Sequence, residues 1–363
     1  MIITINQKKL KESLMVTEKI ISHNLVLPIL QNIVLKTEQG RVKILSTNLE
    51  IGVNCWLGAK IEEEGEVAIP AKIFTNFVNN IESEQITITT KDNIAFIDAE
   101  NFKTKIIGFT AKDFPIIPKS KTTPFVYLEA EQLGLLIGAV LESASLSETR
   151  PELAGVLVKF FSSKIESVAT DSFRLAEQTV TYEGGQEEQS VIIPKNTAQE
   201  ILRVLGIKSG KVAIAISENQ IFFTMGDVEV VSRLIDGHYP DYKRVFPEKA
   251  VAKALLSKES LEKSIRLASV FTSQIADIKI QAGKEGLKIF AKNSDKGEVD
   301  LMVPGALKGE AFKVTVNYRY VLDGLKNIST EKVVMEFTGE DSPLVMRPEG
   351  KSDFVYLIMP LRS

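Results

Sequence analysis

A carboxylate, a hydroxyl and a guanidinium lie close together in the segment VATDSFRLAEQTV (168–180), as Asp171, Ser172 and Arg174. A serine can act as a nucleophile, but that chemistry needs a base within hydrogen-bond reach. The segment contains no histidine and no G-x-S-x-G turn. Because an aspartate in a turn commonly bonds its own backbone, we expect Asp171 to cap the turn and Arg174 to pair with it.

The rest of the chain offers few residues for catalysis or metal binding. It has one cysteine, Cys55, and two histidines, His23 and His238. An internal disulfide is therefore excluded, and a histidine-ligated metal site or a Ser/His/Asp triad has little to draw on. A phosphate-binding G-x-x-x-x-G-K-[ST] loop is also absent from the sequence. We predict no catalytic residue, no metal and no cofactor.

The composition is that of an ordinary globular protein with more than one domain. The chain has 363 residues, of which 44% are hydrophobic and 25% are charged, and its net charge is −3. A single hydrophobic core does not grow to this length. With a charge so near neutral, any basic surface for nucleic acid would have to be local. The early charges of the N-terminus argue against a signal peptide and against a spanning helix. We therefore expect a cytoplasmic location.

One order of elements is repeated three times, in segments of roughly 115 to 125 residues. Each repeat begins with an amphipathic helix, in QKKLKESLMVTEKIIS, AEQLGLLIGAVLESAS and SKESLEKSIRLASVF. The second of these carries an apolar stripe at helical period, formed by Leu133, Leu136, Ile137, Val140 and Leu141. A hairpin follows, and then a strand leads into a second helix, in VAIPAKIFTNFVNNI, VIIPKNTAQEILRVLG and FKVTVNYRYVLDGLKNI. Proline is expected to open the first turn of two of these helices.

Segments rich in proline and lysine separate the repeats, PKSKTTP near 118–124 and PEKAVAK near 247–253. The repeats predict an α+β fold of three domains, each with two helices packed on a predominantly antiparallel sheet. We place the domains at 1–122, 123–250 and 251–363.

Six segments carry a resemblance to a known family: LPILQNIVL (27–35), STNLEIGV (46–53), TRPELAGVLVKF (149–160), ATDSFRLAE (169–177), DGHYPDYKRVFP (236–247) and VYLIMPLRS (355–363). With these motifs in this order, the chain resembles the bacterial DNA sliding clamp, the beta subunit of the replicative DNA polymerase. The resemblance implies three clamp-type domains and a head-to-tail homodimer. Such a ring encircles duplex DNA, slides along it and acts as a processivity factor without catalysis.

Helix spacing favours two chains rather than one in such a ring. Six helices about 10 Å apart form a circle about 19 Å across, too narrow for a duplex once helix thickness is subtracted. Twelve helices form a circle about 38 Å across, with an opening of about 28 Å. The predicted helices carry twelve lysines and arginines against eight acids. This excess suits DNA, but a solvated helix surface would show it equally.

The resemblance also implies a groove between the second and third domains. It would bind short hydrophobic peptides of polymerases, the clamp loader and repair proteins. Apolar side chains would form an adaptable floor, and arginines at the rim would hold a peptide's carbonyl or acidic groups. Ser172 and Phe173 replace a Gly-His pair of the best-known members, and the larger aromatic would narrow the groove. Carried over by position, the walls are Leu153, Gly155, Thr170, Ser172, Phe173, Arg174, Leu175, Pro240, Arg244, Val245, Asn317, Tyr320, Leu357, Met359, Pro360, Leu361 and Arg362.

Two further sets of residues follow from the resemblance. Positions expected to face DNA are Asn24, Lys72, Arg150, Lys195, Arg203, Lys263 and Arg266. An edge strand of the first domain would meet the third domain of the other chain, with opposite charges around an apolar centre. The residues of that interface would be Lys103, Lys105, Ile106, Val270, Phe271, Glu298 and Asp300. From periodicity alone, Val270 and Phe271 fit a core position within the domain equally well.

Two alternatives to a clamp stay open at this point. An enzyme could use Asp171 and Arg174 on the repeated scaffold, and loss of turnover in a folded Asp171→Ala variant would support it. A peptide-binding scaffold that never closes on DNA is the other, and retention on circular but not linear DNA separates it from a clamp.

Overall fold

The computed structural model describes residues 1–21, 27–147, 149–182, 188–247, 249–283, 285–339 and 341–361. The chain divides into two compact units, which we describe separately. Unit 1 comprises residues 1–134 and 199–234, and unit 2 comprises residues 135–198 and 235–363. No helix within the described ranges is long and apolar enough to cross a membrane.

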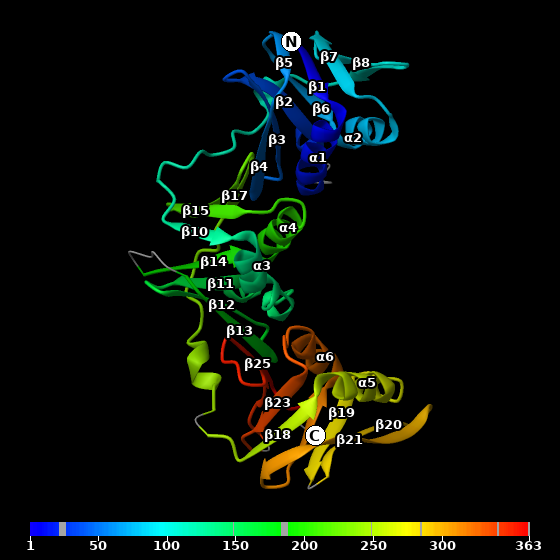
Figure 1. Cartoon of the computed structure of the whole chain (residues 1–363), viewed down its shortest axis with the longest axis vertical. Coiled ribbons are helices and arrows are strands. Elements are labelled where there is room, and N and C mark those ends of the chain that lie inside the picture. The colour runs from blue at the N-terminus through cyan, green and yellow to red at the C-terminus, as the bar shows by residue number, and fades with distance from the viewer. Residues whose placement is uncertain are drawn as a thin grey trace. The chain divides into compact units, whose positions relative to one another are not determined.

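Unit 1 contains a five-stranded antiparallel sheet with β5 and β9 at its edges. In spatial order, its strands are β5 (Lys60–Glu63), β1 (Ile2–Asn6), β7 (Gln85–Lys91), β8 (Ile94–Ala99) and β9 (Phe102–Ile107). Two helices, α1 (Gln7–Thr17) and α2 (Ala71–Asn80), lie side by side in this unit (Figure 1). Leu10 and Leu14 of α1 and Phe74 and Val78 of α2 are fully buried, as amphipathic helices covering a sheet require.

An eight-stranded antiparallel sheet completes unit 1. Its strands, in spatial order, are β10 (Val126–Glu129), β15 (Lys211–Ser217), β16 (Gln220–Met225), β17 (Val228–Arg233), β4 (Ile51–Leu57), β3 (Arg41–Thr47), β2 (Asn32–Glu38) and β6 (Glu66–Pro70). The pairing of β17 with β4 joins strands of the first and second repeats into one sheet.

Unit 2 is built on a twelve-stranded antiparallel sheet. Its strands, in spatial order, are β14 (Gln189–Pro194), β11 (Gly155–Phe160), β12 (Lys164–Thr170), β13 (Arg174–Thr181), β25 (Phe354–Ile358), β24 (Leu344–Pro348), β23 (Lys332–Phe337), β18 (Ala252–Ser257), β21 (Gly297–Gly309), β20 (Gly286–Asn293), β19 (Asp277–Gly283) and β22 (Lys313–Asn317). The β13–β25 pair joins the second repeat to the third. Helices α5 (Lys258–Ser269) and α6 (Tyr318–Lys326) lie side by side (Figure 1).

The helices of the second repeat are α3 (Ala130–Gly138) and α4 (Lys195–Leu205). The prediction that α3 continues through Val140 and Leu141 is wrong, because the helix ends at Gly138 and a 3₁₀ turn follows at Leu141–Ser143. Val140 and Leu141 are nevertheless buried. The apolar stripe therefore predicts the core positions correctly, although the backbone changes from α-helix to 3₁₀ helix.

The starts of the helices follow local chemistry. Side chains of Asn6, Ser257 and Asn317 accept backbone N–H groups in the first turns of α1, α5 and α6. The predicted prolines, Pro70 and Pro194, are the last residues of β6 and β14, and the helices begin one residue later. They therefore precede the first helical turn rather than forming part of it.

Candidate functional site

The turn between β12 and β13 is held by its own side chains. Oδ1 of Asp171 accepts the backbone N–H groups of Phe173 and Arg174, both at 3.0 Å. The Thr170 hydroxyl donates to the carbonyl of Arg174 at 2.6 Å and accepts the N–H of Ser172 at 3.1 Å. Ser172 adopts a φ of 76° in the left-handed region. The predicted capping role of Asp171 is confirmed.

Arg174 lies at the centre of an ion-pair cluster with Asp171 and Asp323. Its Nε donates to Asp171 at 3.0 Å, its Nη1 donates to Asp323, and its Nη2 donates to the carbonyl of Glu142 at 2.5 Å. The guanidinium also stacks 4.6 Å from the centre of the Tyr320 ring. All three guanidinium nitrogens therefore bond within unit 2. The predicted pairing of Arg174 with Asp171 is confirmed.

The electrostatics of this cluster keep the arginine charged. Burial alone would lower the pKa of Arg174, but its interactions with Tyr356 and Asp171 outweigh burial and raise the pKa. Across the described part of the chain, no group of three or more His, Cys, Asp or Glu side chains could hold a metal ion. The contacts of Asp171 and Arg174 thus hold the turn and connect it to α6.

A cavity of about 230 Å³ opens beside the turn, and we call it the Leu357 cavity. It gathers nine of the seventeen predicted wall residues from four separate stretches of sequence. Its lining consists of Arg150, Leu153, Thr170, Ser172, Arg174, Leu175, Pro240, Asp241, Tyr242, Val245, Leu357 and Met359.

The floor of the Leu357 cavity is apolar and uncharged. Leu175 and Leu357 are directly opposite each other in the β13–β25 pair, and both pack with Tyr242 in one buried cluster. Burial, helped by the neighbouring carboxylate of Glu177, raises the pKa of Tyr242 well above its ordinary value, so its hydroxyl stays neutral. Such a floor binds hydrophobic side chains, which lose water on entering it.

The rim of the Leu357 cavity remains accessible in unit 2. Val245 is 44% exposed and Met359 is 37% exposed. Methionine adjusts its shape readily, so the rim can adapt to different side chains. Nη1 of Arg150 lies 3.5 Å from the Ser172 hydroxyl, and its Nε donates to Glu152 at 3.2 Å. Arg150, which is predicted to face DNA, therefore also lines this cavity.

Seven predicted wall residues lie outside the lining of this cavity: Gly155, Phe173, Arg244, Asn317, Tyr320, Pro360 and Leu361. Phe173 is 60% exposed, so the narrowing expected from this aromatic is not observed. The side chain of Asn317 caps α6, and the N–H of Leu361 donates to the carbonyl of Thr315 at 2.8 Å. Arg362 falls outside the described residues.

Sequence reasoning missed Asp241 and Tyr242 as lining residues. Both belong to the segment DGHYPDYKRVFP, in which we named Pro240, Arg244 and Val245. The 3₁₀ turn Tyr242–Val245 is too short to show an apolar period, so the inward position of Tyr242 could not be read from spacing. The aromatic character of Tyr242 was the one available signal.

The predicted DNA-facing residues differ in their exposure and in their hydrogen bonds. Lys72, Lys263 and Arg266 are exposed, and the last two form i,i+4 ion pairs within α5. Such surface pairs are weak enough to exchange for phosphates.

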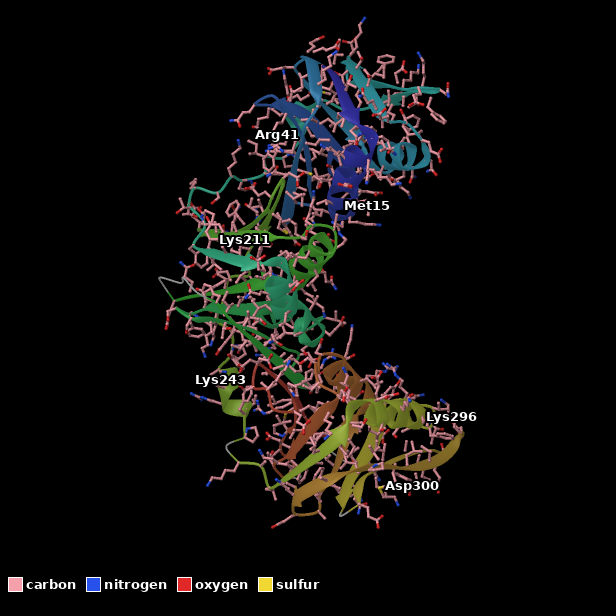
Figure 2. All side chains as sticks on the ribbon, in the orientation of Figure 1. Met15, Arg41, Lys211, Lys243, Lys296 and Asp300 are labelled. Carbon is pink, nitrogen blue, oxygen red and sulfur yellow. The ribbon has the colours of Figure 1, made fainter. Side chains whose placement is uncertain are left out.

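The side chains of Lys195 and Arg203 instead form hydrogen bonds to backbone carbonyls of the same chain. Lys195 donates to the carbonyl of Ala144 at 2.8 Å, and burial lowers its pKa. Arg203 donates to the carbonyls of Met15 and Val16 at 2.6 and 2.7 Å (Met15 is labelled in Figure 2). Asn24 lies outside the described residues.

Two strand edges carry the charged residues predicted for the dimer interface. β9 pairs only with β8, and residues 297–304 of β21 pair only with β20, among the described strands. Lys103 and Lys105 are exposed on the first edge, and Glu298 and Asp300 are exposed on the second. Asp300, labelled in Figure 2, forms an ion pair with Lys288 at 2.6 Å.

The apolar members of the predicted interface divide between surface and core. Val270 is 57% exposed, which argues against its position in the domain core, and Phe271 is half-buried. Ile106 is 5% exposed and belongs to the core, whereas its neighbour Ile107 is 72% exposed. Successive residues of a strand face opposite sides, so Ile107 and not Ile106 shares the exposed face with Lys105.

Comparisons with known proteins cover the whole chain. Family models described as the N-terminal, central and C-terminal domains of the DNA polymerase III beta subunit match residues 1–118, 127–241 and 243–362. A protein named beta sliding clamp from Staphylococcus aureus is 27% identical over 359 residues, covering 96% of this chain and 95% of that protein. Its namesake from Staphylococcus epidermidis is 26% identical over the same shares.

Solved structures agree over the full length. The DNA polymerase III beta subunit of Thermotoga maritima has a TM-score of 0.94 and 26% identity, covering 100% of this chain and 99% of that chain. The DNA polymerase sliding clamp of Bacillus subtilis has a TM-score of 0.96 and 25% identity, with the same coverage.

Proposed function

The chain belongs to the DNA polymerase III beta subunit family, and from this premise we propose that the Leu357 cavity is where it holds its partner proteins. The protein is a DNA sliding clamp, a processivity factor for a DNA polymerase. Its three clamp domains combine sheets with helices, and a ring of two chains is characteristic of the family. The predicted domain limits, 1–122, 123–250 and 251–363, remain our proposal.

The observation that carries the cavity's role is its contrast between floor and rim. An uncharged floor of Leu175, Leu357 and Tyr242 lies beneath a rim of partly exposed Val245 and Met359. A short peptide with hydrophobic side chains would bury them there, while Arg150 would meet a carbonyl or an acidic group. We propose that the polymerase, the clamp loader and repair proteins share this cavity.

Peptide binding tests the proposal. A fluorescein-labelled peptide with the hydrophobic C-terminal residues of the polymerase from the same genome would be titrated by anisotropy. Val245→Asp should weaken binding at least tenfold, because it places a charge against an apolar ligand. Arg244→Ala is the matched control, since Arg244 is 85% exposed and does not line the cavity. Equal affinities for the two variants would overturn the assignment.

For the dimer, we propose that the free edge of β9 in one chain pairs with residues 297–304 of β21 in the other. Pairing would satisfy the backbone groups of both edges. Lys103 and Lys105 would face Glu298 and Asp300, and Ile107 would replace Ile106 as the apolar contact to Val270 and Phe271. Ile107→Asp should yield monomer mass in sedimentation at micromolar concentration. Ile116→Asp, at a side chain that is 93% exposed elsewhere in unit 1, should stay dimeric. If Ile107→Asp also stays dimeric, the edge pairing is wrong.

For DNA, we propose topological retention with weak contacts from Lys72, Lys263 and Arg266. A clamp assembled on a circular plasmid should elute with the DNA in gel filtration and dissociate after linearisation. Equal loss from both forms would favour a scaffold that does not encircle DNA.

A role in bacterial replication implies action in the cytoplasm. We also propose that this chain is not catalytic, since Asp171 and Arg174 are engaged in the turn and the ion-pair cluster.

A further inference from the structure

The turn beside the Leu357 cavity has a close counterpart in unit 1. There, the turn before β4 is held by the same bonds. Oδ1 of Asn48 accepts the N–H groups of Glu50 and Ile51 at 3.0 and 2.7 Å. The Thr47 hydroxyl donates to the carbonyl of Ile51 at 2.8 Å and accepts the N–H of Leu49 at 3.0 Å. Leu49 has a φ of 77°, which matches the 76° of Ser172.

The strand pairing next to the turn is repeated as well. Gly52 of β4 is opposite Val231 of β17, as Leu175 is opposite Leu357. The N–H of Arg233 donates to the carbonyl of Glu50 at 3.0 Å. At the equivalent place in unit 2, the N–H of Met359 donates to the carbonyl of Phe173 at 2.8 Å. The frame that shapes the first cavity is therefore built twice in the chain.

A second hollow lies against this second frame, with a volume of about 110 Å³. We call it the Arg233 groove, and its lining includes Leu49, Glu50, Ile116, Ile117, Val231 and Arg233. Ile117 packs on Val231 as Tyr242 packs on Leu357.

Two replacements give the Arg233 groove its own chemistry. Arg233 stands where the first cavity has Met359, so a cation takes the place of an apolar rim residue. Arg233 is exposed and makes no ion pair with any residue in the described ranges. Leu49, in place of Ser172, is 45% exposed, and Ile116 is 93% exposed. An unpaired cation beside two exposed aliphatic side chains is the complement of a ligand with one aliphatic and one acidic group.

We propose that the Arg233 groove is a second peptide-binding site, specific for a short segment with an aliphatic residue followed by an acidic one. The aliphatic side chain would lie against Leu49 and Ile116, and the carboxylate would pair with Arg233. A partner carrying such a segment could bind while the Leu357 cavity is occupied. The two sites would then hold different ligands on one chain.

Methyl-resolved NMR of the full-length protein tests this site. The probe is acetyl-Gly-Leu-Asp-Gly-amide, and the reporters are the methyl groups of Leu49 and Ile116. Both should shift and saturate with a single dissociation constant. Arg233→Ala should raise that constant at least threefold, as should asparagine in place of the peptide's aspartate. Arg244→Ala, which removes an exposed arginine from the other unit, should leave it unchanged.

Methyl groups of Val245 and Met359 report the Leu357 cavity in the same spectra, so the two sites succeed or fail independently. Ile116→Asp should abolish the shifts at Leu49, because the aliphatic contact is lost and a negative charge opposes the peptide. Absence of saturable shifts at Leu49 and Ile116 would overturn the proposal. It would equally be overturned if Arg233→Ala or the asparagine peptide bound as well as the parent pair.

Discussion

Replacing Arg174 by alanine should destabilise unit 2 strongly. The side chain is 13% exposed, and it lies between the carboxylates of Asp171 and Asp323, which are 17% and 37% exposed. Removing one partner of a buried ion pair costs about 3–5 kcal/mol, since the other charge is left unpaired. Water reaches Asp323 and solvates its carboxylate, so we expect the lower end, about 3 kcal/mol.

Natural chromophores allow the two units to be followed separately. Trp56, the only tryptophan, lies in unit 1, whereas six of the seven tyrosines lie in unit 2. When unfolding is followed by tyrosine fluorescence, the urea concentration at the midpoint should fall by about 1 M. This assumes that the free energy of unfolding decreases by about 3 kcal/mol per molar urea. The transition read by Trp56 fluorescence should stay in place.

Two variants control this experiment. Arg174→Lys keeps the charge but loses the planar fork of donors, so an intermediate loss is expected. Arg244→Ala removes a mostly exposed ion pair with Asp241, and should change stability by no more than about 0.5 kcal/mol. If Arg174→Ala shifts the tyrosine midpoint no further than Arg244→Ala, the cluster does not stabilise unit 2. An equal shift at Trp56 would also refute the reasoning.

Three further predictions use the same optical signals. Arg203→Ala should lower the Trp56 transition by about 1–3 kcal/mol, because two carbonyls near the end of α1 lose a charged donor; an unchanged transition would show that water replaces the guanidinium. Burial raises the pKa of the Cys55 thiol from 9.0 to about 11, so the folded state holds this proton more tightly. The resulting stability is complete below pH 9 and falls by up to about 3 kcal/mol as the pH rises to 11, a slope that Cys55→Ala should remove. In Gly324→Ala, the new Cβ would lie 2.6 Å from the Tyr356 ring, which should cost about 1–3 kcal/mol in the tyrosine transition. Gly134→Ala is a helical control read by Trp56 in unit 1, because the nearest atom there is 3.9 Å away.

The elements of the fold could be predicted where the signal is local. Amphipathic period located both helices of every repeat, and capping side chains such as Asn6 and Ser257 begin two of them. The end of α3 could not be predicted, because Val140 and Leu141 continue the apolar stripe beyond the helix. The apolar pattern predicts which side chains are buried. A 3₁₀ turn buries them as well as another turn of α-helix does, so the pattern does not distinguish the two.

Strand residues show a different limit. The stretch KTKII of β9 ends in two isoleucines, and composition cannot tell which one faces the core. A shift of one residue exchanges the two faces of a strand, so the choice depends on register with β8. Pairing of Ala95 with Ile106 and of Ile94 with Ile107 fixes that register, and with it the exposed face available to a second chain.

The role of Arg174 depends on contacts that no local pattern contains. Its bond to Asp171 spans three residues and could be predicted from the turn, but its bond to Asp323 spans 149 residues. From the sequence alone, an arginine beside an apolar cavity fits a ligand-binding role. The structure shows that its charge is paired with Asp323 of α6. The same comparison shows why Arg233 differs. It stands where Met359 stands in the other frame, and no carboxylate in the described part of unit 1 forms an ion pair with it. The duplicated frame thus holds an ion-pair cluster in unit 2 and, in unit 1, an arginine that has no ion-pair partner among the described residues.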